Sequence, residues 1–218
     1  MVDIGEIKAI IFDLDGVLLS TDKYHYIAWK ALADELGIPF GEKDNEAFRG
    51  VSRMDCMEIL VSKRKDLNLT DEQKTAYAEQ KNNNYRRLLE QITPSFVEDE
   101  VRETLALLRR RGYLLAVGSS SKNSKFILRK TELSNCFDAI VDGNDISRSK
   151  PDPEVFVKAA AALGAQPCQC AVIEDAEAGL LAAVGGEMLP IGIGEAKNSP
   201  LAKIHLETFG ELKDIFTN

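Results

Sequence analysis

Short runs of apolar residues recur along the chain, and each ends in glycine, serine or acidic residues. Their length and β-branched composition are typical of buried strands. The runs cover residues 9–12, 113–117, 137–141, 171–173 and 189–193. Helical spacing of apolar residues lies between most of them. This repeated order of strand and helix predicts an α/β fold with a parallel sheet.

Apolar residues three or four positions apart predict the helices that separate these strands. The stripes consist of Val101, Leu105 and Leu108; of Phe126 and Leu133; and of Val155, Phe156, Ala159, Ala160 and Leu163. Each stripe gives its helix one apolar face, which we expect to pack against the sheet.

Residues from about 20 to 94 interrupt this alternation, because they contain helical stripes but no strand-like run. The first stripe consists of Tyr24, Ala28, Ala31, Leu32 and Leu36. Loop signals stand at residues 37–39 and 67–70, and Thr93-Pro94 disfavours further helix. We therefore predict a helical cap domain over residues 20–94, inserted into a Rossmann-like α/β core of residues 1–19 and 95–218.

Composition places the chain of 218 residues among ordinary globular proteins, with 44% apolar and 28% charged residues. Its 27 basic and 35 acidic side chains leave a net charge of −8. This charge argues against general electrostatic binding to nucleic acid or to an anionic membrane. Any anionic ligand must therefore be held by a local group of charges.

Four cysteines are present, and they form neither a C-x-x-C pair nor a zinc spacing. They are Cys56, Cys136, Cys168 and Cys170. This pattern is typical of free thiols in a reducing compartment. The N-terminal residues lack the pattern of a secretory signal, and no apolar run approaches the roughly 20 residues that span a bilayer. We expect a cytoplasmic protein with neither a membrane nor a nucleic-acid partner.

Polar residues follow four of the predicted strands, where the ligand crevice of a parallel sheet lies. They are Asp13 and Asp15, Ser119 to Asn123, Lys150, and Glu174 with Asp175. Taken singly, these acids have structural explanations, since Asp15 suits a turn and Asp175 suits a helix cap. Together they would repel one another in a partly dry site unless a cation compensated them. Oxygen ligands favour Mg²⁺, and the chain offers no Cys/His set for zinc.

A second feature is a pair of lysines, Lys122 and Lys125, predicted in the first turn of a helix, where a cation opposes the helix dipole. A bound anion would reverse that penalty. The hydroxyls of Ser119 and Ser121 and the Asn123 amide would then complete a phosphate cradle. The alternative, a pair of solvated surface lysines, stays open at this point.

The sequence lacks the motifs of several other classes of enzyme and binding site. The chain has no G-x-x-x-x-G-K-[ST] loop and no G-x-S-x-G elbow, and residues 192–194 lack the third glycine of a dinucleotide site. Residues 119–122 match an S-x-x-K motif, but the S-D-N and K-T-G motifs that accompany it in enzymes with a catalytic serine are missing. With only His25 and His205 present, a histidine-based metal site is not expected, and His205 is interpreted as a strand or surface residue.

Four stretches resemble the motifs of the haloacid dehalogenase superfamily. They are Asp13-Leu-Asp15-Gly-Val17, the serine after the second strand, Lys150-Pro151 and Glu174-Asp175. This resemblance covers the whole α/β core. Four further stretches, residues 24–32, 50–53, 81–85 and 190–194, resemble the β-phosphoglucomutase group within that superfamily.

The resemblance implies that Asp13 is a nucleophile that becomes an aspartyl phosphate, which suits a carboxylate because it is already ionised at neutral pH. It makes Asp15 the general acid and base, and it implies that Ser119 and Lys150 offset charge on the transferring phosphoryl group. The Mg²⁺ ligands implied in the same way are Asp13, the backbone carbonyl of Asp15, Glu174 and Asp175.

The resemblance also implies a site for the phosphate that is not being transferred, with Arg53, Ser121, Lys122 and Asn123 as its residues. It implies that His25 and Lys81 couple closure of the cap domain to Asp15. The full set of implied substrate-binding residues is His25, Trp29, Arg49, Gly50, Val51, Ser52, Arg53, Lys81, Ser120, Ser121, Lys122 and Asn123.

The implied activity is a monomeric mutase that interconverts β-D-glucose 1-phosphate and glucose 6-phosphate through a bisphosphate. Two alternatives stay open: an Mg²⁺-dependent sugar-phosphate phosphatase with the same acids, and a non-catalytic protein that binds sugar phosphates. Three departures from the superfamily pattern bear on substrate preference. Ser20 stands where an acid is common, Arg49 replaces a lysine, and Gly118-Ser119-Ser120 replaces an alanine-rich segment.

Overall fold

The computed structural model describes residues 4–217, which fall into two compact units. The first unit contains the described residues up to Ser20 and those from Thr93 onward, and the second unit is Thr21–Ile92. The second unit is therefore a single insertion into the first. Residues 1–3 and 218, which the predicted core domain includes, lie outside the described residues.

The first unit is built on a parallel sheet, which has six strands in the part of the chain described, in the order β3-β2-β1-β4-β5-β6. The strands are β1 (Ala9–Phe12), β2 (Leu114–Gly118), β3 (Ala139–Val141), β4 (Cys170–Glu174), β5 (Leu189–Gly192) and β6 (Ile204–His205). The strand order reverses between β1 and β4, where Phe12 lies level with Ile173. Ligand crevices of doubly wound sheets lie at such a reversal. The predicted α/β fold class is confirmed.

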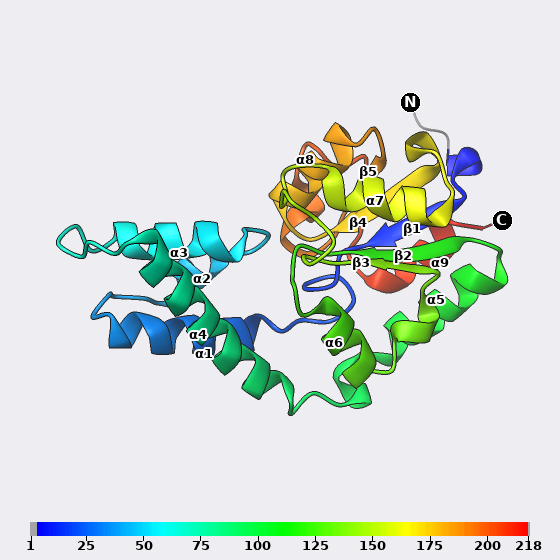
Figure 1. Ribbon diagram of the computed structural model, residues 1–218. Coiled ribbons are helices and arrows are strands. Elements are labelled where there is room, and N and C mark those ends of the chain that lie inside the picture. Colours follow the sequence, from blue (N-terminus) through cyan, green and yellow to red (C-terminus); the bar gives the residue numbers. More distant parts are fainter. Residues whose placement is uncertain (1–3, 218) are drawn as a thin grey trace. The chain divides into compact units, whose positions relative to one another are not determined.

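Helices cover both faces of this sheet. They are α5 (Asp99–Arg110), α6 (Ser124–Lys130), α7 (Glu154–Leu163), α8 (Glu177–Gly185) and α9 (Leu212–Ile215). Figure 1 shows α7 and α8 on one face of the sheet and α5 and α9 on the other. On the α7 side, Ile11 and Val172 pack with Phe156 and Ala160 in one buried cluster. Burial from both faces explains why the strands are continuous apolar runs.

The second unit consists of helices with a core of their own. They are α1 (Asp22–Glu35), α2 (Glu42–Glu46), α3 (Arg53–Ser62) and α4 (Asp71–Leu89). Trp29, Leu32, Phe48 and Met57 are buried together in this core. Thr70 begins α4 with a capping box to Gln73, which satisfies backbone N–H groups at the helix start. Within residues 4–217, no helix combines the length and apolar character needed to cross a membrane.

Two details of the helical stripes differ from the predictions. Ala31 is exposed, and the buried face of α1 consists of Ala28, Trp29, Leu32 and Ala33. Alanine is small enough to lie on the buried or the exposed side of a helix at little cost, so its position indicates the buried face only weakly. Leu133 lies beyond the end of α6, which buries Ile127 and Leu128 instead.

The edge strand β6 is absent from the predicted runs, because two residues are too short to carry a pattern. His205 lies in this strand and is exposed, in agreement with its interpretation as a strand or surface residue.

Candidate active site

Three charged side chains meet beside the reversal point between β1 and β4. Asp13 directly follows β1, and Glu174 is the last residue of β4. The Lys150 Nζ lies 2.5 Å from Asp13 Oδ1 and 2.5 Å from Glu174 Oε1. All three residues are buried. The structure therefore brings together residues that lie far apart in the sequence, at the edge of the sheet where parallel strands end.

The charges of this cluster hold Lys150 as an ammonium. Burial alone would lower the pKa of Lys150, but the negative charges of Asp13 and Glu174 outweigh burial, so its pKa is raised. Burial raises the pKa of Glu174, and the nearby Asp13 charge adds to this effect, while Lys150 opposes it. One ammonium thus faces two buried carboxyl groups.

Asp175 adds a third acid that the single lysine does not neutralise. Burial raises the pKa of Asp175 to about 8, and the charges of Glu174 and Asp13 contribute in the same direction. The predicted alternative, that Asp175 caps the next helix, is wrong. The N-cap of α8 is Ala176, and no side chain caps it. Its N–H donates instead to Glu174 Oε2, over 3.1 Å.

The carboxylate oxygens of these acids are donors of the type that binds hard cations. Within residues 4–217, no group of three or more His, Cys, Asp or Glu side chains is already arranged to hold a metal ion. Lys150 instead bridges Asp13 and Glu174. The available donors are oxygens, and the charges of Glu174 and Asp13 add to the larger effect of burial in raising the pKa of Asp175. Oxygen donors with excess negative charge are the environment in which proteins bind Mg²⁺.

Two glycines make room for these carboxylates, and sequence reasoning did not single them out. Gly16 has a φ of +81°, and a Cβ on it would lie 1.9 Å from Asp175 Oδ2. A Cβ on Gly179 would lie 1.9 Å from the carboxyl carbon of Glu174. No other residue fits at either position without displacing an acid. The glycine that follows Asp15 was a visible signal for the first position, whereas the second offered none.

The loop of residues 119–123 follows β2 and is folded on itself. The Ser121 N–H donates to Ser119 Oγ over 3.3 Å, and the Asn123 N–H donates to Ser121 Oγ over 3.2 Å. The backbone N–H groups of Ser121 and Asn123 are therefore engaged within the loop. Each hydroxyl that accepts one of these bonds keeps its own O–H for donation.

The two lysines predicted in the first turn of a helix, Lys122 and Lys125, are placed differently from each other. Asn123 is the N-cap of α6, so Lys122 precedes the helix and the prediction that it lies in the first turn is wrong. Lys125 does lie in the first turn, where its Nζ is 2.7 Å from Asp145 Oδ2. That ion pair compensates its charge without a ligand, because Asp145 supplies the anion.

Close packing against Phe156 leaves no room for a side chain at Gly118. A Cβ on it would lie 2.7 Å from the ring of Phe156. The same ring lies under Lys150, with its centroid 4.7 Å from the Nζ. On the other side, the Lys150 backbone N–H donates to Ser120 Oγ over 3.5 Å. The departure from the superfamily pattern at Gly118 thus lets an aromatic ring support the buried lysine.

A second group of candidate residues lies within the helical unit. Lys81, which is buried, has its Nζ 2.9 Å from His25 Nδ1 and 4.5 Å from the Trp29 ring centroid. The Tyr85 ring centroid is 5.0 Å from the same Nζ. His25 with Trp29, and Lys81 with Tyr85, are spaced four residues apart on α1 and α4, so each pair shares one helix face. Sequence reasoning assigned no role to Tyr85, although this spacing marks it.

His25 is held neutral. Burial lowers its pKa most, and the positive charges of Lys81 and Arg53 lower it further. Because an ammonium can only donate hydrogen bonds, a charged Lys81 requires His25 Nδ1 to accept, which leaves the proton on Nε2. The imidazole can then donate through Nε2.

The remaining candidates of this unit lie on the segment from Arg49 to Arg53. Arg49 Nη2 lies 2.8 Å from Asp22 Oδ2, so this arginine is already paired with an acid of the same unit. Gly50 has a φ of +72°, which favours glycine, and Val51 packs against the core. Ser52 caps α3 through its Oγ, which is a structural role, and Arg53 begins that helix. Burial lowers the pKa of Arg53.

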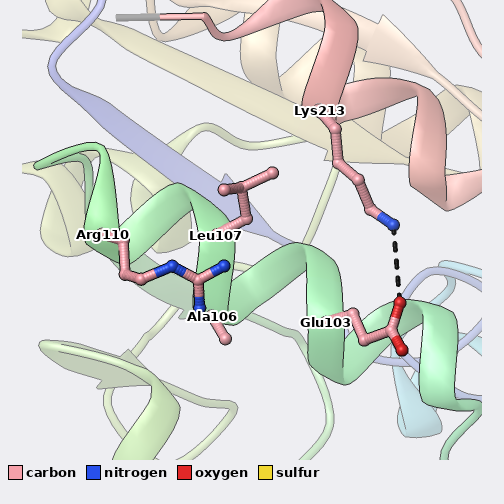
Figure 2. Close-up of a pocket in the computed structure, with 5 residues that line it drawn as sticks. All are labelled: Glu103, Ala106, Leu107, Arg110 and Lys213. Carbon is pink, nitrogen blue, oxygen red and sulfur yellow. Dashed lines mark ion pairs between the residues drawn. The ribbon is translucent and has the colours of Figure 1, made fainter.

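A surface hollow of the first unit lies apart from all of these residues. It is lined by Glu103, Ala106, Leu107, Arg110 and Lys213 (Figure 2). An ion pair of 3.8 Å joins the Lys213 Nζ to Glu103 Oε2 across it. None of the candidate site residues lines this hollow, so it has no part in the site described above.

A protein-family model described as haloacid dehalogenase-like hydrolase matches residues 7–186. The chain belongs to this family. The matched range includes every candidate residue, from Asp13 to Asp175. The resemblance of the chain to the haloacid dehalogenase superfamily is therefore confirmed.

Within the haloacid dehalogenase-like hydrolases, the chain is similar to proteins of two activities. It is 38% identical over 191 residues to a β-phosphoglucomutase of Bacillus subtilis, covering 87% of this chain and 84% of the relative. It is 30% identical over 175 residues to a fructose-1-phosphate phosphatase of Escherichia coli, covering 80% and 89%. A crystal structure of β-phosphoglucomutase from Clostridium difficile matches with a TM-score of 0.88 at 32% identity, over 96% of this chain and 97% of that one.

Proposed function

We propose that this protein is a β-phosphoglucomutase, which interconverts β-D-glucose 1-phosphate and glucose 6-phosphate. The observation that carries the proposal is the buried Asp13 carboxylate, held 2.5 Å from the Lys150 ammonium at the end of β1. Its support is the similarity to β-phosphoglucomutases over most of the chain. A carboxylate placed in this way can attack phosphorus without a separate base.

In the proposed reaction, phosphorylated Asp13 gives its phosphoryl group to the 6-hydroxyl of β-glucose 1-phosphate, which forms the bisphosphate. The bisphosphate turns over, Asp13 takes the phosphoryl group from position 1, and glucose 6-phosphate leaves. Lys150 and Ser119 offset the negative charge on the transferring phosphoryl group. Asp15, two residues further on, gives a proton to the leaving sugar oxygen and accepts one from the attacking hydroxyl. Asp15 must therefore hold a proton during part of the cycle.

Asp13, the backbone carbonyl of Asp15, Glu174 and Asp175 would hold Mg²⁺. The ion supplies positive charge to the oxygens of the transferring phosphoryl group. The presence of three acids, Asp13, Glu174 and Asp175, beside the single Lys150 ammonium supports this part of the proposal. Asp175 would release its proton when the ion binds.

The second phosphate of the bisphosphate would be held by Arg53, Ser121, Lys122 and Asn123. The helical unit would act as a cap that excludes water from the aspartyl phosphate, since hydrolysis would end the mutase cycle. His25 and Lys81 would link this closure to Asp15. The remaining proposed substrate contacts are Trp29, Arg49, Gly50, Val51, Ser52 and Ser120. We expect a monomer in the cytoplasm, and the four free cysteines are consistent with a reducing compartment.

A phosphatase that acts on sugar phosphates is the second candidate, and the similarity to the fructose-1-phosphate phosphatase favours it. Both candidates would use Asp13 and Asp15 and differ in what attacks the aspartyl phosphate, a sugar hydroxyl or water. The third alternative, a protein that only binds sugar phosphates, gives no reason for the acids and the lysine to share one buried cluster.

A coupled assay separates these functions. The protein is incubated with β-glucose 1-phosphate, Mg²⁺ and a trace of β-glucose 1,6-bisphosphate, and both glucose 6-phosphate and free phosphate are measured. We expect glucose 6-phosphate to form much faster than phosphate. Phosphate release that exceeds isomerisation across a panel of hexose phosphates would identify a phosphatase. Asp13→Asn, which nearly preserves the side-chain shape, should abolish turnover while thermal unfolding stays cooperative.

A further inference from the structure

The turn of residues 142–145, which follows β3, lies directly against the loop of residues 119–123. The Gly143 N–H donates to the Ser121 carbonyl over 3.1 Å, and the Ser119 N–H donates to the Val141 carbonyl over 3.1 Å. A Cβ on Gly143 would lie 2.3 Å from the carbonyl oxygen of Ser120. The two backbones are therefore in contact, with no space for a side chain between them.

Asn144 joins this turn to the loop through its side chain. Its Nδ2 donates to the Lys122 carbonyl over 3.0 Å and to Asp142 Oδ1 over 3.0 Å. Its backbone N–H donates to the same Oδ1 over 2.9 Å. Because Asp142 is fully buried, this carboxylate is a fixed anchor, and the Asn144 amide ties the backbone of Lys122 to it.

A second connection holds the same turn. Asp145 Oδ2 accepts from the Asp142 N–H over 2.9 Å and lies 2.7 Å from the Lys125 Nζ. The Lys158 Nζ donates to the Asp145 carbonyl over 2.7 Å. The turn is thus attached both to α6 and to α7, so it can act as a rigid support for the loop.

We propose that Asn144 is a positioning residue for the second phosphate of the sugar bisphosphate. It fixes the backbone of Lys122, and with it the place of the Lys122 ammonium and the Ser121 hydroxyl. In this role Asn144 acts through Lys122 and needs no contact of its own with the substrate. Side chains whose backbone is already fixed lose less conformational freedom when the phosphate binds, so the affinity for the phosphate is higher. This inference rests on the proposed mutase function.

The test compares two substrates that use the site differently. The cycle with β-glucose 1-phosphate passes through a bisphosphate, which occupies both phosphate positions. Acetyl phosphate carries one phosphate and uses only the position at Asp13. In Asn144→Ala, we expect KM for β-glucose 1-phosphate to rise on the order of tenfold, the scale of one or two lost hydrogen bonds, with kcat changing less. The ratio of kcat/KM for β-glucose 1-phosphate to that for acetyl phosphate should fall by the same factor.

Two further variants sharpen this test. Asn144→Asp keeps the shape of the side chain but turns a carboxylate oxygen toward Asp142 and the Lys122 carbonyl, so its effect on KM should exceed that of Asn144→Ala. Asn135→Ala removes another exposed asparagine of the same unit and serves as the matched control. Its kinetic constants should equal those of the wild type.

The outcomes distinguish the two proposals. If the wild type isomerises β-glucose 1-phosphate but Asn144→Ala leaves KM and the substrate ratio unchanged, the positioning role is wrong and the mutase function stands. An equal loss with both substrates would also overturn the positioning role, because it would reflect general damage to the fold. If the wild type forms no glucose 6-phosphate, the mutase function fails and the inference fails with it.

Discussion

The Lys81 Nζ lies 2.9 Å from the His25 Nδ1, within the helical unit. Burial and this neighbouring positive charge together lower the pKa of His25 well below its ordinary value. The aromatic rings of Trp29 and Tyr85 lie 4.5 and 5.0 Å from the same Nζ and partly replace the water that an ammonium loses on burial. The folded unit thus holds a neutral histidine beside a buried cation, which makes its stability depend on pH.

We expect His25 to weaken the fold in acid. Because its pKa in the folded protein is below the ordinary 6.5, the unfolded chain binds a proton more readily as pH falls. The stabilising contribution of the neutral imidazole is complete above pH 6.5 and is lost as pH falls below it toward the folded pKa. In His25→Gln, the drop in unfolding free energy between pH 7.5 and 5.5 should be smaller than in the wild type by on the order of 1 kcal/mol.

Chemical denaturation at the two pH values measures this difference. His205→Gln removes an exposed histidine of the other unit and is the control; it should keep the pH dependence of the wild type. Identical pH profiles for His25→Gln and the wild type would contradict the assignment of a neutral His25.

Gly16→Ala should damage the acid cluster more than backbone strain alone explains. The φ of +81° at Gly16 is unfavourable for alanine, and the new Cβ would collide with Asp175. Gly112→Ala is the matched control, because Gly112 has a φ of +86° but nothing lies within 4 Å of the place that a Cβ on it would take. The control should lose about 1–2 kcal/mol of stability, the cost of a positive φ for an L-residue. Gly16→Ala should lose more and should also lose activity; equal losses in thermal unfolding would show that the contact with Asp175 is unimportant.

Lys150→Met should destabilise the first unit strongly. Removing the ammonium leaves Asp13 and Glu174 buried without their partner, and breaking a buried ion pair in this way costs about 3–5 kcal/mol. The control is Lys158→Met, which removes a half-exposed lysine paired with Glu154 and should cost within about 1 kcal/mol. Urea denaturation measures both. Adding Glu174→Gln to Lys150→Met should restore part of the lost stability, since it removes one of the two uncompensated charges.

Mg²⁺ binding should strengthen as pH rises. The pKa of Asp175 is raised to about 8 from its ordinary 3.8, so below pH 8 the ion must displace a proton from this carboxyl. We expect the affinity for Mg²⁺ to increase by up to about tenfold per pH unit below pH 8 and to level off above it. Isothermal titration calorimetry in buffers of different ionisation enthalpy detects the released proton. In Asp175→Asn, binding should be weaker and nearly independent of pH; a pH-independent affinity in the wild type would contradict the raised pKa.

The pattern of apolar and polar residues along the chain was sufficient to predict the fold class and the position of the acids at the strand ends of the first unit. Buried parallel strands are continuous apolar runs, so their ends are visible in the sequence, and Asp13 and Glu174 stand at two such ends. Because parallel strands end at one edge of the sheet, these acids could be expected to converge from the sequence pattern alone.

Helix starts and loop contacts were less predictable. Lys122 was expected inside a helix that begins two residues later, because the polar residues around Asn123 suit several cap positions equally well. Lys125 pairs with Asp145, which lies 20 residues away, and no local spacing indicates such a pair.

By itself, the sequence of this protein determined the alternation of strands and helices, the helical insertion and the acidic motifs at strand ends, because these depend on short-range periodicity and residue chemistry. Only the tertiary structure decided that Lys150 stands between Asp13 and Glu174, that Gly16 and Gly179 leave space for acids, and that Asn144 supports the backbone of Lys122. Those relations depend on how separate loops approach one another in space, and the spacing of residues along one segment carries no information about that approach.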